Sequence, residues 1–188
     1  TLIQQYQERT DVLLKKDVKK SKLGHWYLSN EITGMSLYVD RFGENIQGLQ
    51  KKLDYFKELG VNFLHLMPIF ESPEGESDGG YAVSDFRKVA TRFGTLQDLQ
   101  NLIADMNTAD MYLMLDIVLN HTSHHHEWAQ KAKGGDPYYQ DFFYFYDHRG
   151  IPDQLDQTMP EIFPESSPGS FSYVPELNKW VMTVFHHY

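Results

Sequence analysis

Polar side chains gather at the end of one apolar run in this chain. The run extends from Leu113 to Leu119 and contains Asp116, and Asn120 and His121 follow it at once. In a parallel α/β protein, side chains at the carboxyl end of a strand point into the ligand crevice. We therefore expect Asp116, Asn120 and His121 to face one small volume. The spacing also allows a structural role, in which Asp116 binds main-chain groups and His121 is a solvated loop residue.

Apolar periodicity places this run in an alternation of strands and helices. Spacings of three and four predict one helix over Glu44–Leu59 and another beginning at Thr95, where Asp98 completes a capping box. The predicted strands are Met35–Val39, Val61–Leu66 and Met111–Val118. Near-continuous apolar strands separated by helices are typical of a parallel sheet with right-handed crossovers.

The flanking segments differ from this central unit, residues 31–120. Residues 1–30 are expected to form a helical lead-in, with a helix start at Thr10 and Asp11. Residues 121–188 are rich in proline and aromatic residues, which predicts an inserted, loop-rich subdomain. A strand is expected over Trp180–Phe185, and a long polar loop over Glu71–Gly80.

Composition excludes several classes of function. The 188 residues suffice for one domain with a real core, and the net charge of −9 argues against nucleic-acid and acidic-membrane partners. The absence of cysteine excludes disulfides and thiolate chemistry. No apolar run approaches the roughly 20 residues that span a bilayer, and no signal peptide opens the chain, so we expect a cytoplasmic location. An aromatic content of 14 % suits a flat, hydroxylated ligand such as a sugar ring.

Several motifs give the chain a family resemblance. The segments that carry it are Asp78–Phe86, Asp116–His121, Asn120–Ala129, Pro152–Gln154 and Glu161–Pro164. Together they resemble the α-amylase superfamily, glycoside hydrolase family 13, and within it the amylosucrases. The resemblance implies an α/β fold: the first three βα units of a (β/α)8 TIM barrel, with a loop-rich domain B inserted after strand 3.

The resemblance also implies a chemistry that this chain holds only in part. Such enzymes retain the α-configuration, using an Asp nucleophile after the fourth strand, a Glu acid/base after the fifth and an Asp after the seventh. None of these catalytic residues is expected here, since a whole barrel takes about 250 residues. We expect a part of an enzyme that transfers glucose from sucrose to an α-glucan, inactive alone. Sucrose hydrolysis, trehalose synthesis, α-glucosidase action and a non-catalytic carbohydrate-binding or inert fragment remain alternatives.

The resemblance assigns binding roles to four residues. Tyr81 would stack on the bound glucosyl ring, and His121 would donate a hydrogen bond to a sugar hydroxyl. Asp116 would organise the site beside an arginine that lies outside this chain, and Asp78 would pair with another arginine. Tyr81 as a plain loop aromatic and Asp78 as part of a flexible acidic loop are the structural alternatives.

No cofactor or metal is expected. The sequence groups four histidines, but no acidic or cysteine ligand is seen to complete a site, which predicts a solvated loop; these are His121, His124, His125 and His126. Asn120 matches a calcium ligand of many α-amylases, yet the amylosucrase-like branch generally lacks that ion. Glu161 and Glu165 lie among prolines and are not expected to act as acid or base. Three strands cut from a barrel leave open edges, so self-association is expected.

Overall fold

A three-stranded parallel sheet lies at the centre of the computed structural model, which describes residues 2–160, 164–165 and 168–183. Its strands run in the order β1 (Gly34–Leu37), β2 (Phe63–Leu66) and β5 (Tyr112–Leu115). Gly34 pairs with Phe63, and Phe63 pairs with Tyr112. The prediction of an α/β chain with a parallel sheet is therefore confirmed.

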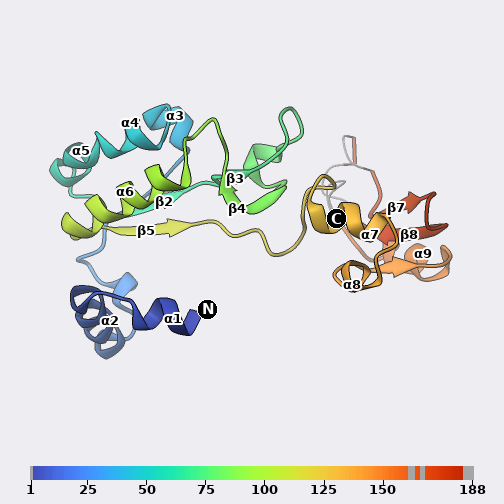
Figure 1. Cartoon of the computed structure of the whole chain (residues 1–188), viewed down its shortest axis with the longest axis horizontal. Helices are drawn as coiled ribbons and strands as arrows, with labels where there is room; N and C mark the ends of the chain where they lie inside the picture. Colours follow the sequence, from blue (N-terminus) through green and yellow to red (C-terminus); the bar gives the residue numbers. More distant parts are fainter. Residues whose placement is uncertain (1, 161–163, 166–167, 184–188) are drawn as a thin grey trace.

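Helices cover one face of this sheet, as Figure 1 shows. They are α3 (Val39–Gly43), α4 (Ile46–Gln50), α5 (Leu53–Glu58) and α6 (Leu96–Thr108). Leu64 and Leu66 of β2 are fully buried beneath them, together with Phe56 of α5 and Leu102 of α6. Because side chains alternate along a strand, His65 must point to the opposite face.

The helix predicted over Glu44–Leu59 is wrong as a single element. The main chain leaves helical geometry at Lys52 (φ −100°, ψ 7°), which separates α4 from α5. Leu49 and Phe56 are nevertheless both fully buried. The apolar period thus predicted the buried face, whereas it carries no information on whether the hydrogen-bond ladder is continuous. Helix α6 does begin at Thr95, with the expected capping box to Asp98.

Strand ends also differ from the predicted ones. β5 stops at Leu115, so Asp116 lies just beyond the strand rather than inside it, and β1 ends at Leu37, before Val39 opens α3. A further antiparallel pair, β3 (Phe70–Glu71) and β4 (Asp85–Val89), flanks the polar loop. β4 was missed because three of its five residues are charged, which hides any apolar pattern.

The first residues form α1 (Leu2–Gln7), α2 (Asp11–Leu23) and the short 3-10 turn η1 (Trp26–Leu28). Helix α2 buries none of its side chains. The ammonium of Lys20 lies 4.5 Å from the ring centre of Trp26 and 4.3 Å from that of Tyr112 on β5. These cation–π contacts join the helix to the sheet edge.

The segment after His121 is more regular than the loop-rich subdomain predicted. It contains α7 (Glu127–Lys133), α8 (Pro137–Gln140), α9 (Gly150–Asp156) and an antiparallel sheet in the order β6 (Phe145–Tyr146), β8 (Lys179–Met182) and β7 (Phe171–Val174). The strand predicted over Trp180–Phe185 corresponds to β8, and its last two residues lie outside the described part. No helix among the described residues is long and apolar enough to cross a membrane.

Candidate functional site

A chain of hydrogen bonds crosses the face of the sheet that the helices leave open. Asp116 accepts a hydrogen bond from the hydroxyl of Tyr81 at 3.1 Å on one oxygen, and its other oxygen lies 2.9 Å from Nε2 of His65. Nδ1 of His65 lies 3.0 Å from the hydroxyl of Ser36. Ser36 lies on β1, His65 lies on β2, Asp116 directly follows β5, and Tyr81 directly follows the polar loop. Neutral or charged, His65 can donate from Nε2 to Asp116.

Asp116 also has partners within this chain, besides the arginine outside it that the resemblance implies. Its side chain is about four-fifths buried, as is that of His65. A carboxylate at this depth needs hydrogen-bond donors to remain charged. Tyr81 and His65 supply them, so Asp116 orients its neighbours and its oxygens are committed to them.

Tyr81 is placed by the glycines that precede it. Gly80 is buried and has a φ of +96°, a conformation that L side chains rarely adopt. A Cβ on Gly80 would come within 3.0 Å of the carbonyl oxygen of Pro68. Glycine is therefore required for the loop to press against Pro68 and deliver Tyr81 to Asp116. Burial, followed by the hydrogen bond to Asp116, raises the pKa of Tyr81, so its hydroxyl remains a donor.

His121 is 9 % exposed, so its interpretation as a solvated loop residue is wrong. Burial lowers the pKa of His121, and the charge of Asp78 and a hydrogen bond with the main chain of Tyr81 act in the opposite direction. The side-chain amide nitrogen of Asn120 lies 3.2 Å from Nδ1 of His121. A neutral imidazole at this place can exchange hydrogen bonds with an uncharged ligand.

The structure brings most of the predicted site together. Tyr81 donates a hydrogen bond to Asp116, and His121 forms a hydrogen bond with the main chain of Tyr81. The charge of Asp78 acts on the imidazole of His121. Asn120 is exposed, and its side chain contacts His121. Sequence reasoning missed His65, although a histidine between the apolar residues of a strand was a usable signal.

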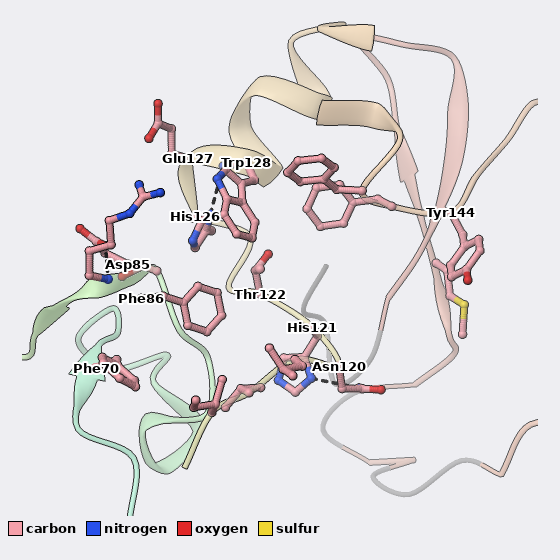
Figure 2. Close-up of a pocket in the computed structure, with 18 residues that line it drawn as sticks. Phe70, Asp85, Phe86, Asn120, His121, Thr122, His126, Glu127, Trp128 and Tyr144 are labelled. Carbon is pink, nitrogen blue, oxygen red and sulfur yellow. Dashed lines mark hydrogen bonds between the residues drawn. The ribbon is translucent and has the colours of Figure 1, made fainter. Parts of the chain in front are cut away.

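An aromatic cavity of about 770 Å³ adjoins this cluster. Figure 2 shows Phe86 and Trp128 on its wall, with ring centres 6.0 Å apart, and His121 and Asn120 lower down. Neither Tyr81 nor Asp116 lines it, so the cavity and the hydrogen-bonded cluster are neighbours that share His121. Six of the cavity's eighteen lining residues are Phe, Trp or Tyr, which provides stacking surfaces; they are Phe70, Phe86, Trp128, Phe142, Phe143 and Tyr144.

His126 supports the part of the cavity wall that Phe86 and Trp128 form. Its Nδ1 accepts a hydrogen bond from the main-chain nitrogen of Trp128 at 3.1 Å and so caps α7. Its ring lies 4.5 Å from that of Trp128 and 5.4 Å from that of Phe86. His126 is 5 % exposed, so the prediction that it belongs to a solvated loop is also wrong.

The free energy of unfolding is expected to fall as the pH drops below the usual histidine value of 6.5. Burial lowers the pKa of His121, His124 and His126 in the folded chain. The unfolded chain therefore binds more protons between the lowered pKa values and 6.5, so stability rises with pH through that window. Urea unfolding at pH values from about 8 to about 5 measures the slope.

His126→Asn is the matched variant for this measurement. Asparagine is a good N-cap residue and does not titrate, so the variant should show a shallower slope. If the free energy of unfolding depended on pH equally in His126→Asn and in the unchanged chain, His126 would not contribute to the pH dependence. A chain that became more stable in acid would contradict the lowered histidine pKa values altogether.

Comparison with known proteins agrees with this geometry. Residues 19–185 match the family described as alpha amylase, catalytic domain. An oligo-1,6-glucosidase of Bacillus cereus is 40 % identical over 110 residues, which are 56 % of this chain and 19 % of that protein. An alpha-glucosidase of Schizosaccharomyces pombe is 44 % identical over 94 residues, which are 50 % of this chain and 16 % of that protein.

Solved structures give the same result. The isomaltulose synthase SmuA of Protaminobacter rubrum superposes with a TM-score of 0.69 at 28 % identity, over 81 % of this chain and 28 % of that one. A mutant isomaltulose synthase of Erwinia rhapontici, solved with its natural substrate sucrose, gives 0.70 at 26 % identity, over 84 % and 29 %. The chain spans about a fifth of the curated relatives it matches. With the family match covering nearly all of its residues, the chain belongs to the alpha-amylase catalytic-domain family, glycoside hydrolase family 13.

Proposed function

We propose that this chain forms part of the catalytic domain of a retaining enzyme that cleaves an α-glucosidic bond. The observation that carries the proposal is the convergence of Tyr81, Asp116 and His121 beside the carboxyl end of β5. An aromatic ring, a fixed carboxylate and a neutral imidazole are the groups that hold a glucosyl ring by stacking and hydrogen bonds. In this proposal Tyr81 stacks on the ring, His121 donates a hydrogen bond to one of its hydroxyls, Asp116 positions Tyr81, and Asp78 pairs with an arginine at the wall of the pocket.

The proposed architecture is the first three βα units of a (β/α)8 barrel, with a domain B inserted after the third strand. Residues 1–30 would precede the barrel, residues 31–120 would supply its strands, and residues 121–188 would form the insertion and the return. Two features support this. β1 and β5 each pair on one side only within the described sheet. Beyond β5, Ile117 is 63 % exposed and Leu119 is 88 % exposed, as expected of surfaces that further barrel units would cover.

Sucrose is the first substrate to test. An amylosucrase-like transfer of glucose from sucrose to an α-glucan rests on the motifs at Asp78–Phe86 and Asn120–Ala129. A related isomaltulose synthase has been solved with sucrose as its natural substrate, which supports a sucrose donor without distinguishing transfer from isomerisation.

Hydrolysis of short α-glucosides is the second candidate. It is favoured by the 40 % identity to an oligo-1,6-glucosidase and the 44 % identity to an alpha-glucosidase. The segments of those relatives that match here form a small share of their length, so the match supports a glucosyl-binding site more directly than it supports one acceptor.

Product analysis tests the proposal. The longer enzyme containing this chain is incubated with sucrose, maltose or isomaltose, and the products are separated by chromatography. We expect fructose and α-glucan from sucrose; sucrose isomers would instead indicate an isomerase, and glucose released from isomaltose would indicate a glucosidase. No cleavage of any α-glucoside would refute the enzyme proposal.

The 188-residue chain alone should cleave none of these sugars, because the resemblance places the nucleophile and acid/base of the retaining mechanism after later strands, outside the chain. Turnover by the pure chain that disappears on changing one of its own carboxylates would contradict this. A tryptophan-fluorescence titration with sucrose or maltose distinguishes a carbohydrate-binding module, which responds saturably, from an inert fragment.

A further inference from the structure

Glu76, His124 and His125 converge on one point of the surface although they come from two separate loops. Nε2 of His124 lies 3.6 Å and Nε2 of His125 lies 3.5 Å from the same carboxylate oxygen of Glu76. All three potential ligand atoms lie within 4.8 Å of one another. The prediction that no acidic residue completes the histidine group is therefore wrong. The polar loop brings Glu76 to it through contacts that sequence spacing does not reveal.

These separations match the edges of a zinc coordination shell. Zinc binds histidine nitrogen and carboxylate oxygen at about 2.0–2.2 Å, which places neighbouring ligand atoms of a tetrahedron about 3.4 Å apart. The two measured nitrogen–oxygen distances are close to that edge. Two imidazoles and one carboxylate supply three ligands, and a water molecule would complete the fourth position.

Hydrogen bonds hold the main chain of both histidines without an ion. The main-chain nitrogen of His125 donates to Oγ of Ser123 at 3.2 Å, and the carbonyl oxygen of His124 accepts from Nε2 of Gln130 at 2.6 Å. Ser123 is fully buried, and its main-chain nitrogen donates to Val83 at 2.8 Å. A fixed backbone reduces the ordering that metal binding would otherwise require.

The three side chains are also accessible to an ion. They are 32 % (His124), 53 % (His125) and 60 % (Glu76) exposed. Partial exposure leaves each ligand atom within reach of an ion from solvent while the loops hold the three residues together.

We propose that Glu76, His124 and His125 form a zinc-binding site. The proposal does not rest on the glycosidase function. Glu76 precedes Asp78 by two positions, and His124 follows His121 by three. A bound ion would therefore tie the loop that carries Asp78 and Tyr81 to the segment that carries His121, and would restrict the motion of one relative to the other.

Zinc titration of the full 188-residue chain by calorimetry tests the proposal, with cobalt as a spectroscopic probe. We expect one ion per chain, and the visible absorption of tetrahedral cobalt. Glu76→Gln keeps the shape and removes the anionic ligand, and His125→Ala removes an imidazole. Each should weaken zinc binding at least about tenfold. Loss of a residue that only hydrogen-bonds to a metal ligand already lowers metal affinity by about 10- to 100-fold, and loss of the ligand itself should cost at least as much. His25→Ala, which removes an exposed histidine elsewhere, should bind zinc as the unchanged chain does.

Two further outcomes would overturn the site. One is the absence of saturable zinc binding, or an affinity that stays the same in either Glu76→Gln or His125→Ala. The other is loss of binding in a His186→Ala/His187→Ala variant, which would assign the ion to the histidines near the end of the sequence. Circular dichroism of each variant verifies that the fold is retained. The proposal is supported if zinc raises the melting temperature of the unchanged chain and does not raise that of Glu76→Gln.

Discussion

In the α-glucoside-cleaving enzyme proposed above, Asp116→Asn is expected to lower kcat/KM by about 10- to 100-fold. The carboxylate serves two partners, Tyr81 at 3.1 Å and His65 at 2.9 Å. The amide keeps one acceptor oxygen and has no charge, so at least one charge-assisted hydrogen bond is lost. Such a bond contributes about 1.5–3 kcal/mol, which corresponds to the expected range. Tyr81 and His65 would then no longer be fixed in the positions that the proposed glucosyl site requires.

Other variants separate this positioning role from a general loss of structure. Tyr81→Phe removes only the hydroxyl and keeps the stacking ring, so its effect should be smaller than that of Tyr81→Ala. Asp54→Asn changes an aspartate whose side chain is 89 % exposed on α5, and it should leave kcat/KM unchanged. Equal rates for Asp116→Asn and the unchanged enzyme would exclude Asp116 from the site. Equal losses in Tyr81→Phe and Tyr81→Ala would exclude the stacking role of the ring.

Phe56→Ala is expected to lower the free energy of unfolding of the chain by about 3–5 kcal/mol. Phe56 is completely buried between the sheet and the helices, and its ring stacks on that of Phe42 at 5.1 Å between centres. Its removal loses apolar burial and leaves a cavity among close-packed side chains. A loss of this size is a large part of the about 5–15 kcal/mol that stabilises a small domain, so the urea midpoint of the variant should fall steeply. Urea unfolding followed by circular dichroism measures the change.

Tyr55 provides a matched control on the same helix. It is 50 % exposed and lies next to Phe56 in the sequence. Tyr55→Ala removes an aromatic ring of similar size and should cost clearly less, because much of that ring already contacts water. Similar losses in the two variants would mean that α5 does not pack as described.

Local patterns in the sequence predicted helix α6 and the three strands of the central sheet. The capping box at Thr95 and Asp98 depends on residues three positions apart, and it opens α6 as expected. The strands that pair as β1, β2 and β5 were predicted from short apolar runs, and their parallel order follows from the helices between them. The residues of Asp78–Phe86 and Asp116–His121 also indicated the family to which the chain belongs. Each of these signals lies within one short segment.

Contacts between distant segments were decided by the tertiary structure. Nothing in the sequence near Asp116 shows that His65 would bond to it, or that Glu76 would reach His124 and His125. The break at Lys52 likewise leaves the apolar period intact and is invisible to it. Periodicity reports which face of an element is buried. The partners of a polar group depend instead on how loops fold over the sheet, because a buried carboxylate or imidazole is stable only where such a loop delivers a hydrogen-bond partner.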